Sequence, residues 1–272
     1  MGKRRILTAR GPSGELETSR IVLPREVRTR GHRLFYVEVG MGTPVILIHG
    51  LGGSSRWWFP ILPSLSAAHF RLLAPDLPGF GRSPGSFLEV PRAARTLIEL
   101  ADRVGLGRFF VCGHSLGGAV AAQLAADYRD RIRALVLVNS AGIPGVGPAR
   151  WLGRVMQPWS WCPLGFLGTM LGDMLRAGPG TMWAGARHLR RYDLRPVLER
   201  MSGMPTLVIW GQKDSLTPPR HAREIAAELD SSRLEWVPNA YHLPMVSHPE
   251  IVSRLIVGFF QEGSSSASRP RD

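Results

Sequence analysis

The chain has 272 residues, a formal net charge of +13, 44% hydrophobic residues and 20% charged residues. That hydrophobic content excludes a mostly disordered chain and is sufficient for a full-sized core. The basic excess suggests nucleic acid or an anionic membrane as a partner. It lies in residues 1–33, with nine basic and three acidic side chains, and in residues 142–203, with eight and three. Without a run of five like charges or a basic helix interleaved with aromatics, we expect no nucleic-acid partner.

Residues 1–20 are polar and rich in Arg, Gly and Ser, so we expect a flexible basic arm there. Short apolar runs then alternate with stretches of helical length and period. The apolar runs are residues 34–40, 44–50, 70–76, 108–114, 133–139, 206–211 and 233–238. The helical patterns are residues 91–104, 116–128, 219–229 and 248–260. This alternation predicts an α/β fold with a mostly parallel central sheet of about eight strands, flanked by helices.

Residues 142–203 interrupt the alternation. They contain no clear strand, many Gly and Pro residues and four of the eight Trp residues. Because a structureless loop of about sixty residues is uncommon in a compact domain, we predict an inserted helical lid. The core is then residues 21–141 and 204–261, and the polar residues 262–272 are expected to form a disordered tail.

The sequence Gly-His-Ser-Leu-Gly at residues 113–117 lies between an apolar run and an Ala-rich helical pattern. It matches the Gly-x-Ser-x-Gly nucleophile elbow in the strand–turn–helix context that this motif requires. The turn is so sharp that the serine takes strained backbone angles, and the glycines leave room for neighbouring backbone. We predict that Ser115 is a nucleophile. The alternative is a glycine-rich turn with a structural serine.

A second glycine-rich segment, His-Gly-Leu-Gly-Gly at residues 49–53, ends another apolar run. Acyl transfer needs two backbone N–H donors directed at the oxyanion of the tetrahedral intermediate. In elbow enzymes one donor is the amide after the nucleophile, here Leu116, and the other comes from the loop after an earlier strand, here Leu51. Taken alone, the segment is equally consistent with a flexible turn.

Further motifs are DLPGFGRS at residues 76–83, WGQKDSLTP at 210–218 and NAYHLPMVSHPE at 239–250. Together with the two glycine-rich segments, they make the chain resemble the α/β-hydrolase superfamily, and within it the lid-bearing serine hydrolases of the esterase and lipase kind. In this superfamily the nucleophile, the acid and the base follow one another in that order along the chain. The resemblance therefore implies Asp214 as the acid and His242 as the base.

Other residues compete for these roles. Asp76 and Asp193 are alternative acids, but neither follows the strand that carries the acid in this superfamily. His248 is an alternative base, but the sequence His-Pro-Glu reads as the start of a helix. We expect Asp76 to stabilise a turn, and His49 to support the predicted oxyanion loop.

The serine at the elbow argues against the dehalogenase and epoxide-hydrolase branches, which use aspartate, and favours acyl transfer to water. Carbon–carbon bond hydrolases of the superfamily also use serine, usually preceded by Asn and combined with a lid Arg that binds a substrate carboxylate. Here His114 precedes the serine, but the lid arginines keep that alternative open. These are Arg187, Arg190 and Arg191. A ligand receptor that retains the triad is a third alternative.

The aromatic content of the lid predicts an apolar substrate pocket. The candidate pocket residues are Gly50, His114, Trp57, Trp58, Trp159 and Trp183. Because an aromatic-rich lid must also pack on the core, some of these Trp side chains are equally expected to lie away from substrate.

The expected activity is hydrolysis of small to medium apolar carboxylic esters, with a small-molecule ester as substrate. We expect no metal and no cofactor, because no ligand spacing or phosphate-binding pattern occurs. The two cysteines, Cys112 and Cys162, do not form a disulfide pattern, and no secretory signal is evident, so a cytoplasmic protein is expected. No run reaches the roughly 18 apolar residues of a membrane span. We therefore expect no stable membrane insertion, although the basic lid leaves peripheral lipid contact open.

Overall fold

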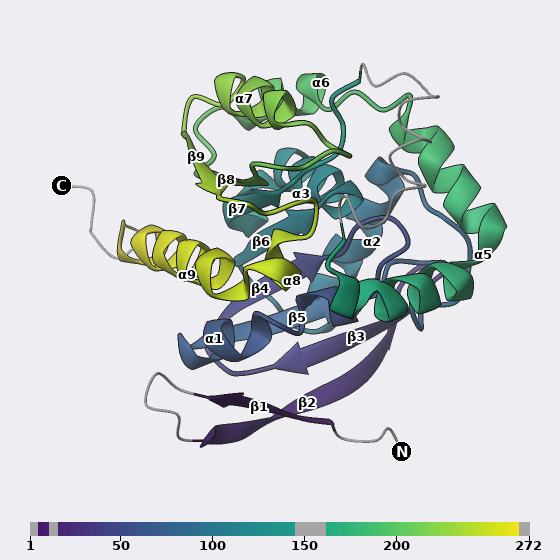
Figure 1. Cartoon of the computed structure of the whole chain (residues 1–272), viewed down its shortest axis with the longest axis vertical. Coiled ribbons are helices and arrows are strands. Elements are labelled where there is room, and N and C mark those ends of the chain that lie inside the picture. Colours follow the sequence, from purple (N-terminus) through teal and green to yellow (C-terminus); the bar gives the residue numbers. More distant parts are fainter. Residues whose placement is uncertain (1–4, 11–15, 145–161, 267–272) are drawn as a thin grey trace.

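The computed structural model describes residues 5–10, 16–144 and 162–266 (Figure 1). In this part of the chain one nine-stranded sheet has the order β1-β2-β3-β5-β4-β6-β7-β8-β9. The strands are β1 Arg5–Arg10, β2 Leu16–Arg28, β3 Arg33–Val39, β4 Thr43–Ile48, β5 Phe70–Pro75, β6 Phe109–His114, β7 Ile132–Val138, β8 Thr206–Gly211 and β9 Ser232–Val237. The strands from β5 to β9 in this order are parallel, and β1, β2 and β3 add antiparallel pairs at one edge. The predicted fold class is confirmed.

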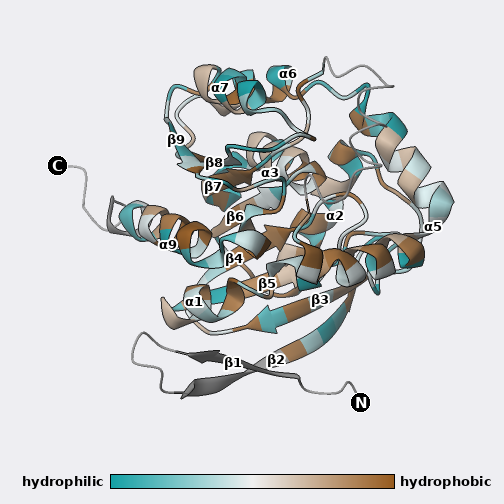
Figure 2. Cartoon of the chain, in the orientation of Figure 1, coloured by the Kyte–Doolittle hydropathy of each residue, from teal (hydrophilic) through white to brown (hydrophobic). Residues whose placement is uncertain are grey.

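Helices cover both faces of the sheet (Figure 1). They are α1 Leu62–Ala67, α2 Val90–Arg103, α3 Leu116–Asp127, α5 Leu167–Leu189, α6 Arg195–Leu198, α7 Pro219–Ala227, α8 Pro244–Ser247 and α9 Pro249–Ser266. Short 3₁₀ helices are η1 Ser55–Trp58, η2 Arg129–Arg131, η4 Leu164–Phe166 and η5 Glu199–Met201. Figure 2 shows hydrophobic residues concentrated in the central strands and on the inner faces of the helices.

The central strands are mostly apolar because both of their faces are buried. In β4, Ile46 and Ile48 pack in a hydrophobic cluster with α2 and α3, whereas Val45 and Leu47 pack in a second cluster with α1 and α9. Successive side chains of a strand point to opposite faces, so a continuous apolar run supplies both clusters. All six residues of β6 and of β8 are buried for the same reason.

The N-terminal segment differs from the expected flexible arm. Residues Arg5–Arg10 pair with β2, which itself pairs antiparallel with β3. Backbone hydrogen bonds between strands order such a segment without requiring a hydrophobic sequence pattern. This hairpin raises the strand number from about eight to nine.

The predicted lid lies between β7 and β8; of its residues 142–203, the structure describes 142–144 and 162–203, which contain helices and no strand. Helix α5 is kinked at Gly178, which has φ 76° and ψ 161° and precedes Pro179. Proline removes a helical hydrogen bond and clashes with the preceding turn, so the two halves of α5 lie at an angle (Figure 1). Residues 145–161, including the predicted pocket residue Trp159, lie outside the described part.

The C-terminal helix α9 continues to Ser266, so the start of the expected disordered tail is helical instead. No helix within the described residues combines the length and apolarity needed to cross a membrane.

Candidate active site

Ser115 occupies the sharp turn between β6 and α3. Its φ of 53° and ψ of −118° lie in a region that residues with a side chain rarely adopt. A Cβ atom on Gly113 would lie 2.1 Å from the carbonyl oxygen of Gly117, and one on Gly117 would lie 2.2 Å from that of Ile48. Only glycine fits at both positions, as the sequence predicted from the sharpness of the turn. Ser115 lines a pocket on the molecule.

The two predicted oxyanion donors lie on segments that meet at this turn. Leu116 is the first residue of α3, so its N–H has no acceptor within the helix and points out of the positive end of the helix dipole. Gly50 follows β4, and a Cβ atom there would lie 3.1 Å from the Cβ of Ser115. Leu51 follows Gly50 and lines the same pocket as Ser115. The loop after β4 therefore packs directly against the serine.

Asp214 and His242 are in direct contact, since Nδ1 of His242 lies 2.8 Å from Oδ2 of Asp214. Both side chains are buried. Burial alone raises the pKa of Asp214. The opposing effects are larger in total: the charge of His242 and hydrogen bonds from His242, Thr217 and Asn139 hold that pKa below its usual value. Asp214 is therefore a carboxylate at neutral pH and can orient the His242 ring.

Two residues that support Asp214 were not identified from the sequence. Asn139 follows β7 and donates a hydrogen bond from its amide nitrogen to Oδ2 of Asp214. Its amide oxygen accepts from the N–H of Gly211, 3.1 Å away. The Thr217 hydroxyl donates to the same Oδ2 atom, and its backbone N–H donates to Oδ1 at 3.0 Å. The sequence features that could have identified these two residues are the Asn at the end of the apolar run 133–139 and the Thr in KDSLTP.

His114 lies beside the His242 ring, with 4.8 Å between the ring centroids. Its Nε2 is 2.8 Å from the carbonyl oxygen of His242, and because a carbonyl oxygen only accepts, Nε2 carries the hydrogen. Burial, together with the neighbouring His242, lowers the pKa of His114 well below its usual value. His114 is thus neutral and holds the backbone of the His242 loop.

His49 is buried and its ring bonds the loop after β4, which holds the predicted oxyanion donor Leu51. Its Nδ1 donates to the carbonyl oxygen of Gly50 at 2.8 Å, which leaves Nε2 to accept from the N–H of Leu77 at 3.0 Å. Burial lowers the pKa of His49, against the raising effect of the nearby Asp76 carboxyl. A neutral His49 can both donate and accept, as these two bonds require.

Acid is expected to destabilise the fold through His114. In the unfolded chain a histidine titrates near pH 6.5, while in the folded chain the pKa of His114 is well below its usual value. Below about pH 6.5 the unfolded state therefore binds a proton that the folded state does not, and the free energy of unfolding falls by about 1.4 kcal/mol per pH unit for this residue. Stability is retained above that pH.

Urea unfolding of the wild type and of His114→Gln, measured between about pH 7 and pH 5.5, tests this dependence. The variant should show the shallower loss of stability with falling pH. Parallel pH profiles for the two proteins would contradict the assignment of His114 as a buried neutral histidine.

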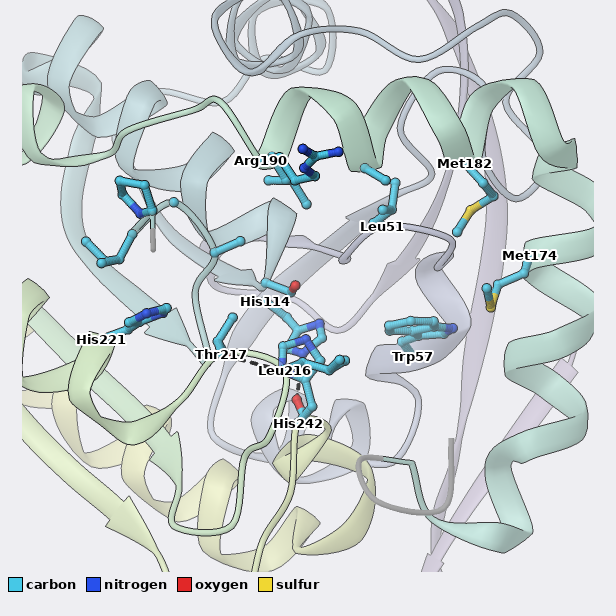
Figure 3. A pocket seen from close by; sticks show the side chains of 17 residues that line it. Leu51, Trp57, His114, Met174, Met182, Arg190, Leu216, Thr217, His221 and His242 are labelled. Atoms are coloured by element: carbon cyan, nitrogen blue, oxygen red, sulfur yellow. Dashed lines mark hydrogen bonds between the residues drawn. The ribbon is translucent and has the colours of Figure 1, made fainter. Parts of the chain in front are cut away.

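The pocket lining contains five of the predicted site residues, Leu51, Trp57, His114, Ser115 and His242, but not Gly50, Leu116 or Asp214 (Figure 3). Its polar lining residues are His114, Ser115, Arg190, Thr217, His221 and His242. Its other lining residues are Leu51, Trp57, Ala141, Gly142, Ile143, Pro144, Met174, Met182, Ala186, Leu189 and Leu216. In Figure 3 Trp57 stands on one side of His114 and His242, and Thr217 on the other. The cavity is therefore mostly apolar, and the rings of His114 and His242 lie next to each other in its lining.

The predictions for two tryptophans are corrected by the structure. Trp58 is fully buried in the hydrophobic cluster that contains α1 and α9, and it does not line the pocket. Trp183 is 65% exposed, and its ring centroid lies 5.2 Å from Cζ of the Arg187 guanidinium. It also lies outside the pocket lining. Aromatic content predicted an apolar lid but not which face of each helix the aromatic side chains occupy.

The competing residues have other roles. Asp76 accepts hydrogen bonds from the N–H groups of Ser55 and Arg82, at 2.6 and 2.8 Å, and so stabilises a turn as expected. Asp193 forms a salt bridge with Arg195. His248 lies between α8 and α9, where its Nδ1 is 2.8 Å from the hydroxyl of Ser247. None of these three side chains lines the pocket.

Within the described residues, no group of three His, Cys, Asp or Glu side chains is arranged to hold a metal ion. The chemistry that the pocket offers is a serine hydroxyl at a strained turn, a His–Asp hydrogen bond and a helix N-terminus. Such an arrangement, on a mostly parallel sheet with helices on both faces, defines a hydrolase of the α/β type.

Comparison with known proteins agrees with this class. The chain matches the model of the Alpha/beta hydrolase family over residues 45–255. It is 31% identical to pimeloyl-[acyl-carrier protein] methyl ester esterase of Pectobacterium carotovorum subsp. carotovorum, over 84% of this chain and 98% of that protein. It is 25% identical to 2-hydroxy-6-oxo-6-phenylhexa-2,4-dienoate hydrolase of Burkholderia cepacia, over 92% and 98%. A thermophilic esterase from Thermogutta terrifontis has a similar structure, with a TM-score of 0.76, 26% identity and coverage of 90% and 99%. The chain belongs to the alpha/beta hydrolase family.

Proposed function

We propose that the protein is a carboxylic-ester hydrolase for small to medium apolar esters, working through an acyl-enzyme. The observation that carries the proposal is that Ser115, at its strained turn, and His242, bonded to Asp214, line one mostly apolar pocket. A mostly apolar cavity with a few polar groups suits an ester with a hydrocarbon acyl or alcohol part. The similarity to an esterase at 31% identity supports the same reaction class.

In the proposed mechanism, the Ser115 oxygen attacks the ester carbonyl while Nε2 of His242 takes the hydroxyl proton. The N–H groups of Leu51 and Leu116 stabilise the resulting oxyanion. His242 then gives the proton to the departing alcohol, which leaves an acyl group on Ser115. A water molecule, deprotonated by His242, releases the carboxylic acid in the same way. Asp214 keeps the hydrogen of His242 on Nδ1 throughout, so that Nε2 faces the serine.

A series of p-nitrophenyl esters from acetate to laurate tests the proposal, combined with intact-mass measurement after a fluorophosphonate reagent. We expect hydrolysis with a preference among chain lengths and a single adduct on Ser115. Absence of both ester hydrolysis and an adduct would exclude a serine esterase.

Carbon–carbon bond hydrolysis of a diketo acid is the second candidate, and the position of Arg190 favours it. Arg190 follows α5 and lines the pocket, where its charge can bind a substrate carboxylate (Figure 3). The 25% identity to a hydrolase of a dienoate supports the same reading.

Replacing Arg190 by Gln separates the two candidates. For a diketo-acid hydrolase we expect KM for the acid to rise at least about tenfold, because a charge-assisted hydrogen bond contributes about 1.5–3 kcal/mol. KM for neutral p-nitrophenyl esters should stay unchanged in the same variant. Equal KM values for the acid in both proteins would remove the second candidate.

A further inference from the structure

Asp173, on lid helix α5, is a charged side chain with no exposed surface. Burying a carboxylate is unfavourable unless hydrogen bonds and opposite charge compensate for the lost water. Here Oδ2 accepts from the Ser54 hydroxyl at 2.8 Å and from Nε1 of Trp57 at 3.2 Å. Oδ1 accepts from the guanidinium of Arg56 at 2.5 Å. These three donors come from the core, in the turn that directly follows the loop after β4. A fourth donor, Nη1 of Arg176 on α5 itself, lies 3.4 Å from Oδ1.

The same helix lies against the loop that holds the predicted oxyanion donor. A Cβ atom on Gly52 would lie 2.9 Å from Cγ of Met174, the residue after Asp173. In the second half of α5, a Cβ atom on Gly185 would lie 2.3 Å from Cδ1 of Leu51. The lid helix and this loop are thus closely packed at both points, so a shift of α5 changes the packing of the loop.

The hydrogen bond that Asp173 accepts from Trp57 also fixes the position of a side chain that lines the pocket. Trp57 lines the pocket, and its ring centroid is 5.8 Å from that of His114. Its Nε1 hydrogen bond to Asp173 selects one orientation of the indole, because an inverted ring would leave Nε1 unbonded in a buried place. Met174 lines the pocket as well. The Asp173 carboxylate therefore determines the positions of two side chains that line the pocket, those of Trp57 and Met174.

We propose that Asp173 is a positioning residue that ties the lid to the oxyanion loop and, through Trp57, sets the acyl-chain preference of the pocket. The proposal rests on the esterase function for its substrate readout. Asp173 does not line the pocket, so its effect on substrate choice must pass through Trp57 and the placement of α5.

Asp173→Asn tests the proposal, because the amide keeps the shape of the side chain but removes the charge and one acceptor oxygen. We expect the ratio of kcat/KM for long and short p-nitrophenyl esters to change by about fivefold or more, mainly through KM, since pocket contacts of this size discriminate 10- to 200-fold. Ile256→Ala, on α9, is the matched control. It lowers Tm through a core cavity but does not itself line the pocket and makes no hydrogen bond to Asp173, so its ratio should equal that of the wild type.

A double-mutant cycle with Trp57→Phe, which removes only the Nε1 donor and part of the ring, tests the route of the effect. If Asp173 acts through Trp57, adding Asp173→Asn to Trp57→Phe should change the chain-length ratio little further. The proposal is overturned if Asp173→Asn lowers Tm but leaves the ratio unchanged, or if the two substitutions act additively on it. A wild type that hydrolyses no ester would instead remove the proposed function. In that case the test of Asp173 uses the rates at which long- and short-chain fluorophosphonates label Ser115, and their ratio replaces the ratio of kcat/KM values.

Discussion

Replacing Ser115 by Ala is expected to lower kcat for ester hydrolysis by about 10⁶-fold. The substitution removes the atom that forms the acyl-enzyme, so neither His242 nor the oxyanion donors can act on a covalent intermediate. The backbone angles of the turn stay unfavourable for Ala as for Ser, so the fold should change little. The measurement is kcat for the preferred p-nitrophenyl ester, with a thermal melt to confirm that the variant is folded.

Ser253→Ala is the matched control for this substitution. Ser253 is also buried, but its hydroxyl donates to the carbonyl oxygen of Glu250 in α9 and lies outside the pocket lining. We expect that variant to keep wild-type kcat. A Ser115→Ala protein that retains more than about 1% of wild-type kcat would show that hydrolysis does not proceed through this serine.

The central part of the fold could be predicted from the sequence because its signals are local. A strand buried on both faces is mostly apolar along its whole length, as in β6 and β8, and such runs are visible without any tertiary information. The elbow is local in the same way. The close approach of Gly113 to Gly117 follows from the turn itself, whereas Gly117 approaches Ile48 of the neighbouring strand β4.

The N-terminal hairpin could not be predicted, because β1 and β2 are held by pairing and not by a hydrophobic pattern of their own. The orientations of Trp58 and Trp183 depend on which side of a turn or a lid helix meets the core. Neither the composition nor the spacing of aromatics contains that information.

The partners of the site carboxylates are also beyond the sequence. Asn139 and Asp214 lie 75 positions apart, and Ser54 and Asp173 lie 119 apart. The first pair meets because β7 and β8 are neighbours in the sheet, so their carboxyl ends lie together. The second meets only because α5 packs against the loop after β4. Chain order could identify Asp214 as the acid, but it gave no sign of a role for Asp173.

Replacing Asp214 by Asn is expected to lower kcat by about 10⁴-fold, because the amide cannot replace the carboxylate in either of its orientations. Oδ2 accepts from His242, Asn139 and Thr217. Oδ1 accepts from the backbone N–H groups of Leu216 and Thr217. An NH₂ group at the Oδ2 position donates to His242 and forces the ring hydrogen onto Nε2, where it blocks transfer of the serine proton. At the Oδ1 position the NH₂ group faces two backbone donors that cannot rotate.

The comparison variant is Asp230→Asn, whose carboxylate also accepts from a backbone N–H, that of Gly203, and from a hydroxyl, that of Ser202, on an exposed loop. Its kcat should equal that of the wild type, since Asp230 lies outside the pocket lining. Retention of more than about a tenth of wild-type kcat in Asp214→Asn would contradict the assigned tautomer of His242. Because Asp214 accepts five hydrogen bonds from four residues, the loss of activity should be accompanied by a lower Tm, whereas Ser115→Ala loses activity without it.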